Sequence, residues 1–477
     1  MLRILLAIWR FVVPFTLLIV ALGVLVSRGV AVLDISRGAL DTPRSLLVYG
    51  AFSVALFLVG LVLAYNGAAL FYRLTRGKPR VIALAPAKPR PGRGDALRQY
   101  RRVGLILAGG GAKGAYQAGA MRAIWEFLEE NRALDRVCMI AGSSIGSWNA
   151  LFWMAGLIVP PAPDGQSAHE MWWRAIKPER ILDFDWYVPL TGNHFGRATP
   201  WRQTFRQLYV DNQLVRGQVT RLLAPRPDRR DHPGSRAQPL HFYFTRSNVG
   251  RGLLEFTTNS WAVADLKRAD PRTGASVPVV DPSLYQVLDG GDPAQALREL
   301  EDAVFASMDI PPVFPFVKMK DPVYGTDEWF EDGGVIDNLP VVFGTEIEQC
   351  DLLFVLPLNA TFDAPVNRRS ILARLSRVME TRQGVIERNS FKLTYLYNDL
   401  HQAKGRARVS IFAICPAEPL AVGTIDFHKA REAGAAYRLM YEETTTELKR
   451  GFANLTPDWI RLVTVGPDRT RRYVENF

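Results

Sequence analysis

The chain has 477 residues, of which 48% are hydrophobic and 22% charged. This composition excludes a wholly disordered, collagen-like or many-span membrane protein, and the length allows a full hydrophobic core. Its 58 Lys and Arg residues against 47 Asp and Glu residues leave a net charge of +11. The cysteines are widely spaced and form no CxxC, which argues against a disulfide framework or zinc site and favours a reducing compartment; they are Cys138, Cys350 and Cys415.

Two long apolar stretches open the chain. Residues 11–27 carry no charge, with apolar residues continuing back past Arg10, and residues 45–72 form a run of 28 without a charge. A spanning helix needs about 20 apolar residues, and Pro14 would kink the first one, which a membrane helix tolerates. A cleaved signal peptide is disfavoured because no A-x-A cleavage site follows the first stretch. Two buried core helices are disfavoured because they would not carry so long an uncharged run. We therefore predict a two-helix transmembrane anchor over residues 1–72.

Positive charge is concentrated directly after the second apolar stretch. Residues 73–102 hold ten Lys or Arg and one acid, and so carry nine of the eleven net charges. A nucleic-acid-binding protein would more often spread basic residues over a folded face, so no nucleic-acid partner is expected. We interpret residues 73–102 as a Pro/Gly-rich juxtamembrane linker that contacts anionic lipid headgroups. The positive flanks put both ends of the hairpin inside, which predicts an integral membrane protein with its main body on the cytoplasmic side, as in a bacterial inner membrane.

The segment after the linker alternates buried strands with helices. The apolar run VGLIL (Val103–Leu107) predicts a strand, followed by a glycine cluster and a helix at 115–131. A second strand at 136–141 leads into another glycine-rich turn and a helix from Ser147. This order predicts an α/β fold with a mostly parallel sheet. Farther along we expect a strand pair at 240–244 and 253–257, strands at 351–358 and 409–414, helices at 368–400 and 425–452, and an exposed, disordered insertion at 225–239.

The second glycine-rich turn has the pattern GxSxG at Gly142-Ser143-Ser144-Ile145-Gly146. In a nucleophile elbow the serine occupies a sharp strand-to-helix turn, where a side chain at either flanking glycine would clash. The turn exposes the serine Oγ at a helix N-terminus, whose dipole favours an oxyanion. The pattern alone is weak evidence. Its place between a predicted strand and a predicted helix makes Ser144 a candidate nucleophile.

The first glycine cluster runs from Gly109 to Gly114 and allows three interpretations. It matches the dinucleotide-binding pattern GxGxxG, but that motif also needs an acid at the end of the second strand, where this chain has the GxSxG. It could instead form an oxyanion hole, with backbone N–H groups directed at a developing negative charge. It could also be a simple glycine-rich turn. We favour the oxyanion hole and interpret Lys113 as structural.

A third cluster, Asp332-Gly333-Gly334, puts an acid next to two glycines that allow another loop to approach closely. Asp332 could act as general base for Ser144, in the place that histidine takes in a triad. Taken alone, an aspartate in a turn is the simpler interpretation. A calcium site is also conceivable, although the spacing lacks the EF-hand pattern; its further ligands would be Glu328, Glu331 and Asp337.

Together, these clusters resemble the patatin-like phospholipase family. The resemblance covers about residues 103–343 and is specific because four motifs occur in the family's order. They are LILAGGGAKGAYQAGAM (Leu105–Met121), AGSSIG (Ala141–Gly146), ASMDIPPVFP (Ala306–Pro315) and EDGGVIDNLPV (Glu331–Val341).

The resemblance implies a three-layer α/β/α sandwich and hydrolysis of acyl esters in membrane phospholipids, without a metal or cofactor. The implied substrates also include related lipids, and the implied catalytic group is a serine–aspartate dyad without histidine, which maps to Ser144 and Asp332. The oxyanion loop maps to Gly109, Gly110 and Gly111, the elbow to Gly142 and Gly146, and the supporting motif glycines to Gly114, Gly333 and Gly334.

The resemblance also divides the body of the chain. It implies a catalytic domain at 103–345, and we expect residues 346–477 to form an α/β extension that completes or covers it. One departure is that many members carry an aspartate in a strand segment between the two dyad motifs, whereas here FYFTRSNVGRG (Phe242–Gly252) has no acid. Acyl transfer by the same dyad and a non-catalytic membrane scaffold remain alternatives. A triad completed by His401 or His428 is disfavoured, because both lie in or beside predicted helices.

Overall fold

In the computed structural model, the described residues are 94–161, 165–183, 196–223, 239–270, 272–288, 290–311, 313–321, 323–359, 371–416, 420–453 and 460–465, with 60, 67 and 194. All but two residues of the predicted anchor lie outside these ranges. So do most of the predicted linker and nearly all of the predicted insertion. No helix in the described ranges combines the length and apolarity needed to cross a bilayer.

A ten-stranded sheet forms the centre of the described residues, in the order β12-β11-β10-β1-β2-β3-β4-β7, with β9 paired to β3 and β8 to β9. Neighbours from β12 to β3 are parallel, and both β4 and β9 run antiparallel to β3. The predicted α/β fold with a mostly parallel sheet is confirmed. The strands are β1 (Val103–Leu107), β2 (Val137–Gly142), β3 (His241–Asn248), β4 (Leu253–Thr258), β7 (Tyr285–Val287), β8 (Val317–Lys320), β9 (Asp327–Asp332), β10 (Leu352–Leu356), β11 (Ser410–Pro416) and β12 (Ile460–Val465).

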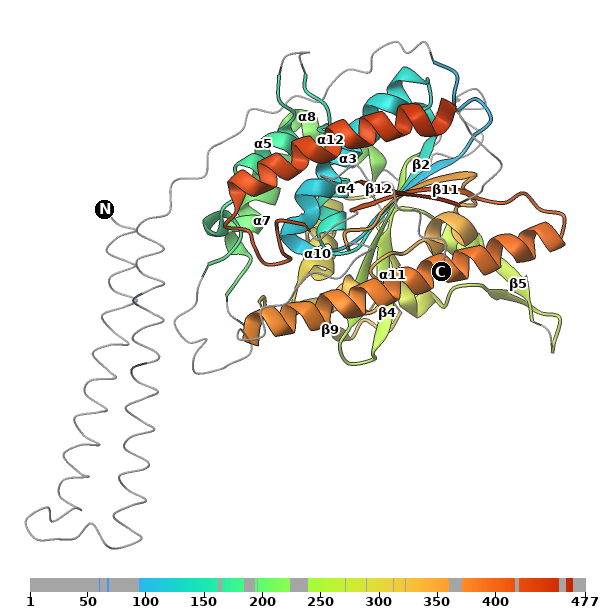
Figure 1. The fold of residues 1–477 in the computed structure, drawn as a ribbon. Helices are drawn as coiled ribbons and strands as arrows, with labels where there is room; N and C mark the ends of the chain where they lie inside the picture. Colours follow the sequence, from blue (N-terminus) through green and yellow to red (C-terminus); the bar gives the residue numbers. More distant parts are fainter. Residues whose placement is uncertain are drawn as a thin grey trace, which may run out of the picture. The chain divides into compact units, whose positions relative to one another are not determined.

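Helices cover both faces of this sheet (Figure 1), with α11 on one face and α3 and α12 on the other. Successive side chains of each strand point to opposite faces of the sheet, and so pack against one helix layer or the other. Val355 of β10 belongs to the apolar core that includes Phe391 of α11. The neighbouring Phe354 and Phe412 instead contact Phe452 of α12, with ring centroids 6.0 and 5.1 Å away. The result is an α/β/α arrangement of three layers.

The helices begin near the predicted positions. The predicted helices at 115–131, 368–400 and 425–452 correspond to α3, α11 and α12, although α12 starts later, at Ala430. The helices are α3 (Gly114–Glu130), α4 (Ile145–Met154), α5 (Ala168–Arg174), α7 (Thr199–Phe205), α8 (Gln213–Leu222), α9 (Ala262–Asp265), α10 (Pro293–Met308), α11 (Ile371–Ala403) and α12 (Ala430–Ala453).

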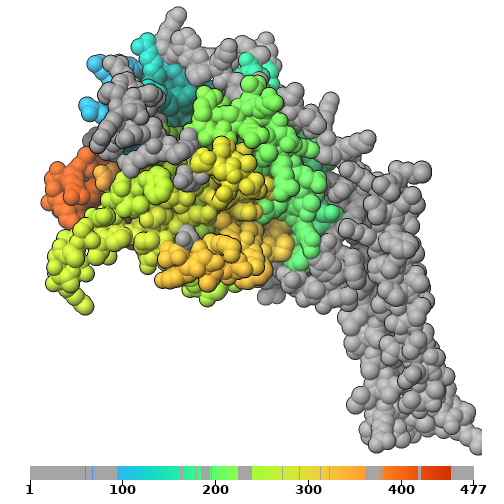
Figure 2. Space-filling model, turned by 180° about the vertical axis from the view of Figure 1, so that it is seen from behind, coloured from blue at the N-terminus to red at the C-terminus, as the bar shows by residue number. Residues whose placement is uncertain are grey.

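The described chain divides into two compact units. Residues 94–178, 202–311 and 316–465 belong to the larger one, which holds the sheet and the helices around it. In that unit, the two-stranded ribbon of β5 (Lys267–Ala269) and β6 (Ser276–Pro278) protrudes from the surface in Figure 2. Among the described residues of the smaller unit, Asp183 and Arg197 exchange two backbone hydrogen bonds.

Candidate active site

The turn between β2 and α4 has the geometry of a nucleophile elbow. Ser144 has φ 53° and ψ −127°, a strained conformation for a residue with a side chain. A Cβ on Gly142 would lie 2.6 Å from the carbonyl carbon of Gly146, and a Cβ on Gly146 would collide with the carbonyl oxygen of Leu107. The strand and helix can therefore meet this tightly only with glycine at both positions. Ser144 is left at the N-terminus of α4, where the helix dipole favours negative charge.

Ser144 and Asp332 are brought into direct contact. The Ser144 Oγ donates a hydrogen bond of 2.5 Å to Oδ2 of Asp332, and the N–H of Gly334 donates to the other carboxyl oxygen at 2.8 Å. The Asp332 backbone is fixed as well, because its N–H donates to the carbonyl of Asp309 and its carbonyl accepts from the Ser247 hydroxyl. The carboxylate is thereby held with one oxygen directed at the serine.

Burial gives Asp332 the properties of a base that works near neutral pH. Desolvation raises the pKa of its carboxyl to about 7, although hydrogen bonds from Ser144 and Gly334 act in the opposite direction. The next residue, Gly333, has no room for a side chain, since a Cβ there would lie 2.5 Å from the carbonyl oxygen of Thr245 on β3. A carboxyl with this pKa can accept and return a proton at physiological pH.

The structure divides the three glycines that the sequence analysis assigned to an oxyanion hole. Gly110 and Gly111 line a cavity together with Ser144. The N–H of Gly109 instead donates to the side-chain oxygen of Asn338 at 3.1 Å, so this group supports the loop from behind. Gly111 has a φ of +56°, and a Cβ there would collide with the carbonyl oxygen of Thr424.

The glycine loop packs tightly against helix α4. A Cβ on Gly114, the first residue of α3, would lie 2.6 Å from Cγ1 of Ile145 and 2.7 Å from the ring of Trp173. The backbone N–H of Ser144 donates to the Ser307 hydroxyl at the end of α10, at 3.0 Å. Ser307 belongs to the ASMDIPPVFP segment, but its contact with Ser144 was not predicted from the sequence.

Helix α11 reaches the back of the glycine loop through buried polar groups. The Asn338 amide donates to the Gly109 carbonyl at 3.2 Å and to Glu387 at 2.7 Å, and Asn359 donates to the same Glu387 oxygen at 2.9 Å. Burial raises the pKa of Glu387 to about 8. The Lys113 ammonium lies 3.0 Å from Glu380, a second link between the loop and α11. Neither glutamate is near a recognisable motif in the sequence.

The cavity beside Ser144 is small, with a volume of about 40 Å³. One buried water needs roughly 10–15 Å³ of such space, so the cavity has room for a few water-sized groups. Part of its wall comes from α11. The lining residues are Gly110, Gly111, Ser144, Ile310, Pro311, Asp332, Gly334, Val335, Arg382, Gln383 and Thr424.

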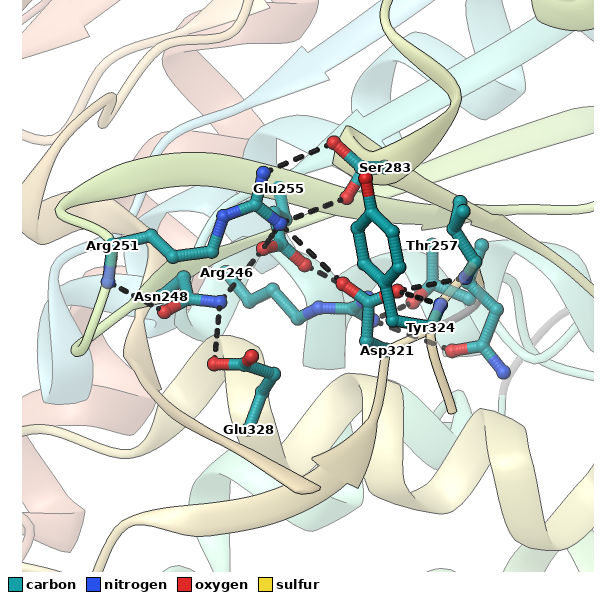
Figure 3. A network of polar contacts seen from close by, with 11 residues as sticks. Arg246, Asn248, Arg251, Glu255, Thr257, Ser283, Asp321, Tyr324 and Glu328 are labelled. Carbon is teal, nitrogen blue, oxygen red and sulfur yellow. Dashed lines mark hydrogen bonds and ion pairs between the residues drawn. The ribbon is translucent and has the colours of Figure 1, made fainter. Parts of the chain in front are cut away.

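A buried polar network links β3 and β4 to the β8–β9 hairpin (Figure 3). Arg246 of β3 lies opposite Asp332 of β9 in register, and its side chain is 1% exposed. The guanidinium contacts Glu255 of β4 at 3.4 Å, donates to Thr257 and stacks 4.5 Å from the ring centre of Phe330. The segment that lacks the family's aspartate thus contains a buried arginine, whose carboxylate partner comes from the next strand.

The same network continues to the β8–β9 hairpin. Arg251 contacts both Glu255 and Asp321, at 3.5 and 3.4 Å, and donates to Ser283. Asn248 bridges Glu255 and Glu328. β9 is therefore anchored to its neighbours by side chains as well as by the backbone ladder, which limits the movement of Asp332 at its end.

The alternative residues named from the sequence have other partners. Glu328 bonds to Asn248, and Asp337 accepts from the N–H of Leu339, so these acids do not converge on one point. His401 packs against Tyr397 on α11, with ring centroids 4.0 Å apart. In the described ranges, no hydrogen bond joins His401 or His428 to Asp332.

Asp309 is a buried acid that the sequence analysis did not single out. Its side chain lies near the backbone of Val317 but makes no hydrogen bond of normal geometry within the described part. Desolvation, together with the nearby charge of Asp332, raises its pKa to about 9. A neutral Asp309 near Asp332 adds no negative charge that would oppose ionisation of Asp332.

Among the comparisons with known proteins, one family model matches the chain. Residues 105–343 match the family model described as patatin-like phospholipase. No curated protein sequence matches the chain. Among solved structures, VipD from Legionella pneumophila is 14% identical, with a TM-score of 0.31, over 80% of this chain and 72% of VipD. The type III effector ExoU of Pseudomonas aeruginosa is 12% identical, with a TM-score of 0.28, over 73% of this chain and about half (53%) of ExoU.

Proposed function

This chain belongs to the patatin-like phospholipase family, and we propose that it cleaves acyl ester bonds of membrane phospholipids with Ser144 as nucleophile and Asp332 as its base. The observation that carries the proposal is the 2.5 Å hydrogen bond from the Ser144 Oγ to Asp332, made at a strained elbow and beside a cavity. A serine is a weak nucleophile until an adjacent base accepts its proton. Asp332 is the acceptor in contact with this one.

In the first half of the reaction, the Ser144 Oγ attacks the ester carbonyl carbon while its proton passes to Asp332. The tetrahedral intermediate carries its negative charge on the former carbonyl oxygen. Collapse of the intermediate breaks the bond to the leaving alcohol, which takes the proton from Asp332. The acyl group is then bound to Ser144 as an ester.

The negative charge is stabilised by backbone N–H groups. Gly110 and Gly111 line the cavity on one side of Ser144, and the first turn of α4 contributes its dipole on the other. Donors fixed in this way need no rearrangement as charge develops, which is why such groups contribute strongly to catalysis. Gly109 takes the supporting role, since its N–H is bonded to Asn338.

In the second half, water replaces the alcohol. Asp332 accepts a proton from the water as the water oxygen attacks the acyl carbonyl, and the proton then returns to the Ser144 Oγ as the fatty acid leaves. The pKa of about 7 for the Asp332 carboxyl suits both roles. Each step conserves atoms and charge without a metal or cofactor.

The N-terminal segments place this chemistry at a membrane. We propose that residues 1–72 form a two-helix anchor and that the basic residues of 73–102 contact anionic headgroups. The active site then lies on the cytoplasmic side, in a bacterial inner membrane. An anchored enzyme keeps its site next to an insoluble substrate at all times.

The test of the dyad is labelling with a fluorophosphonate, which reacts with activated serines. Wild-type protein should be labelled, Ser144→Ala should not, and Asp332→Asn should be labelled much more slowly. Ser143→Ala is the matched control, because the neighbouring Ser143 is fully buried and its hydroxyl bonds to the carbonyl of Asp337. Labelling that survives in Ser144→Ala and disappears in Ser143→Ala would refute the assignment. Release of fatty acid from phospholipid vesicles tests the substrate class.

A further inference from the structure

Helix α11 carries apolar side chains on its inner and its outer face. Phe391 on the inner face is 3% exposed and packs in the core below the sheet. On the outer face, five apolar side chains are between 43% and 66% exposed. We call these five the α11 stripe: Val378, Val385, Leu393, Leu396 and Leu400. The outer face of a helix on a globular protein is ordinarily polar, and a contiguous exposed apolar patch marks an interaction surface.

The stripe lies on one side of α11 and is interspersed with positive charge. Its members are 7, 8, 3 and 4 residues apart, which places them on one side of a helix along about 33 Å. Exposed basic residues lie between them, at Arg382, Arg388 and Lys392. The acid Glu380 is engaged with Lys113. Apolar residues bordered by Lys and Arg are typical of helices that lie in the interface of a bilayer.

The same helix forms part of the active-site wall. Arg382 and Gln383 line the cavity beside Ser144, and Glu387 is bonded to the residue that holds Gly109. The half of α11 that holds Arg382 and Gln383 therefore borders the reacting groups, and the stripe runs along the outer face of the same helix. The phospholipid ester bonds lie at the depth of the headgroup region, where an interfacial helix rests.

We propose that the α11 stripe is a docking surface for an anionic lipid bilayer, on which it lies parallel to the membrane plane. The proposal rests on the proposed function, because it names the surface through which that site meets its substrate. Leucine and valine side chains enter the acyl boundary, and the three basic residues contact acidic headgroups.

A second copy of the chain fits this surface less well. Symmetric pairing would put Arg382, Arg388 and Lys392 of one copy near the same residues of the other. Asp399, beside the end of the stripe, is the exposed acid on this side of the helix and is already 3.7 Å from Arg408. Acidic lipid headgroups compensate the positive charge without this repulsion.

The experiment places an environment-sensitive fluorophore on the stripe of the full-length chain. In a Ser144→Ala background, Leu396→Cys is labelled with NBD, and labelling is selective because all three native cysteines are buried. Glu442→Cys, exposed on α12 across the sheet, is the control. In phosphatidylcholine–phosphatidylglycerol vesicles, NBD at 396 should shift to shorter wavelength and be quenched by nitroxide-labelled lipid, more than in phosphatidylcholine alone. NBD at 442 should do neither.

Two outcomes overturn the proposal. A probe at 396 that stays as polar as the probe at 442 shows that the stripe does not contact lipid. A blue shift that nitroxide lipid does not quench shows that protein, such as a second copy, covers the stripe. Because this measurement uses a protein without the nucleophile, it remains decisive even if the chain has no hydrolase activity.

An activity measurement adds a second arm. In Leu393→Asp/Leu396→Asp, the ratio of phospholipid hydrolysis in vesicles to hydrolysis of a water-soluble short-chain ester should fall about tenfold, since two leucines no longer enter the bilayer. Leu214→Asp on α8 is matched in exposure, at 64% for both Leu214 and Leu396, and should leave the ratio unchanged. An equal fall in Leu214→Asp, or an unchanged ratio in the double variant, argues against a specific role of α11.

Discussion

The carboxyl group of Glu387 on α11 accepts a 2.7 Å hydrogen bond from Asn338, the residue that holds both backbone polar groups of Gly109. The hydrogen bonds of Asn338 thereby join α11 to the glycine loop, which is far from it in the sequence. The contact lies outside the cavity, so Glu387 acts on the reaction only by positioning other groups.

We expect Glu387→Ala to reduce the rate of fluorophosphonate labelling about tenfold, less than the 10²–10³ typical for loss of an oxyanion donor. The amides of Asn338 and Asn359 would lose a buried acceptor, which should also lower the free energy of unfolding by about 1–3 kcal/mol. Glu387→Gln retains an oxygen that can accept both bonds and should react at close to the wild-type rate. Equal rates in the alanine variant and wild type would exclude the positioning role.

The pH dependence of ester hydrolysis should reflect Asp332. Its carboxyl must be ionised to accept the serine proton, and burial raises its pKa from 3.8 to about 7. We therefore expect kcat/KM for a water-soluble ester to rise with pH and to reach half its maximum at about pH 7. Because a soluble ester avoids membrane binding, the profile reports the free enzyme. A half-maximum close to pH 4, where an aspartate ordinarily titrates, would contradict the raised pKa of Asp332.

The sequence predicted the parts of the fold and site that depend on local pattern. β1 and β10 are continuous apolar runs because both faces of a parallel sheet are covered. The elbow at Ser144 follows from the glycines on either side of it. Its partner Asp332 was identifiable only through a motif, because the contact joins residues 188 positions apart.

The supporting residues could not be predicted in this way. Arg246 and Glu387 are charged residue types that are almost always exposed, and only the tertiary structure provides the partners that allow their burial. Gly109 shows the same limit at the site itself. Its place in the glycine cluster suggested an oxyanion donor, but the direction of its N–H depends on Asn338 from a distant segment.

The Arg246–Glu255 pair offers a test of the network beside β9. Both side chains are 1% exposed, so removing one partner leaves a buried charge and should cost about 3–5 kcal/mol of stability. We expect Arg246→Met and Glu255→Met each to lower the midpoint of urea unfolding strongly. The double variant Arg246→Met/Glu255→Met removes both charges and should recover much of the loss. Additive losses would indicate that the two side chains do not act as a pair.

Asp309 should make stability depend on pH. Its folded-state pKa is about 9 against an ordinary value of 3.8, so the folded protein binds a proton that the unfolded chain releases. The cost of this burial is absent below about pH 4 and grows as pH rises towards 9. Asp309→Asn removes it, and the variant should gain a few kcal/mol relative to wild type between these limits. Melting temperatures of both proteins across this range measure the effect; a difference that does not change with pH would contradict it.

The packing of α12 on α3 can be tested by one substitution made in two helices. A Cβ on Gly119 of α3 would collide with the carbonyl oxygen of Tyr437 on α12, whereas Gly217 of α8 has nothing within 4 Å of the same position. Gly217→Ala should stabilise the protein by about 0.5–1 kcal/mol, the gain in helix propensity. Gly119→Ala obtains the same gain but must push two backbones apart, so we expect a net loss of about 1–3 kcal/mol. Thermal unfolding of the two variants measures the difference, and stabilisation in both would show that α3 and α12 do not pack this closely.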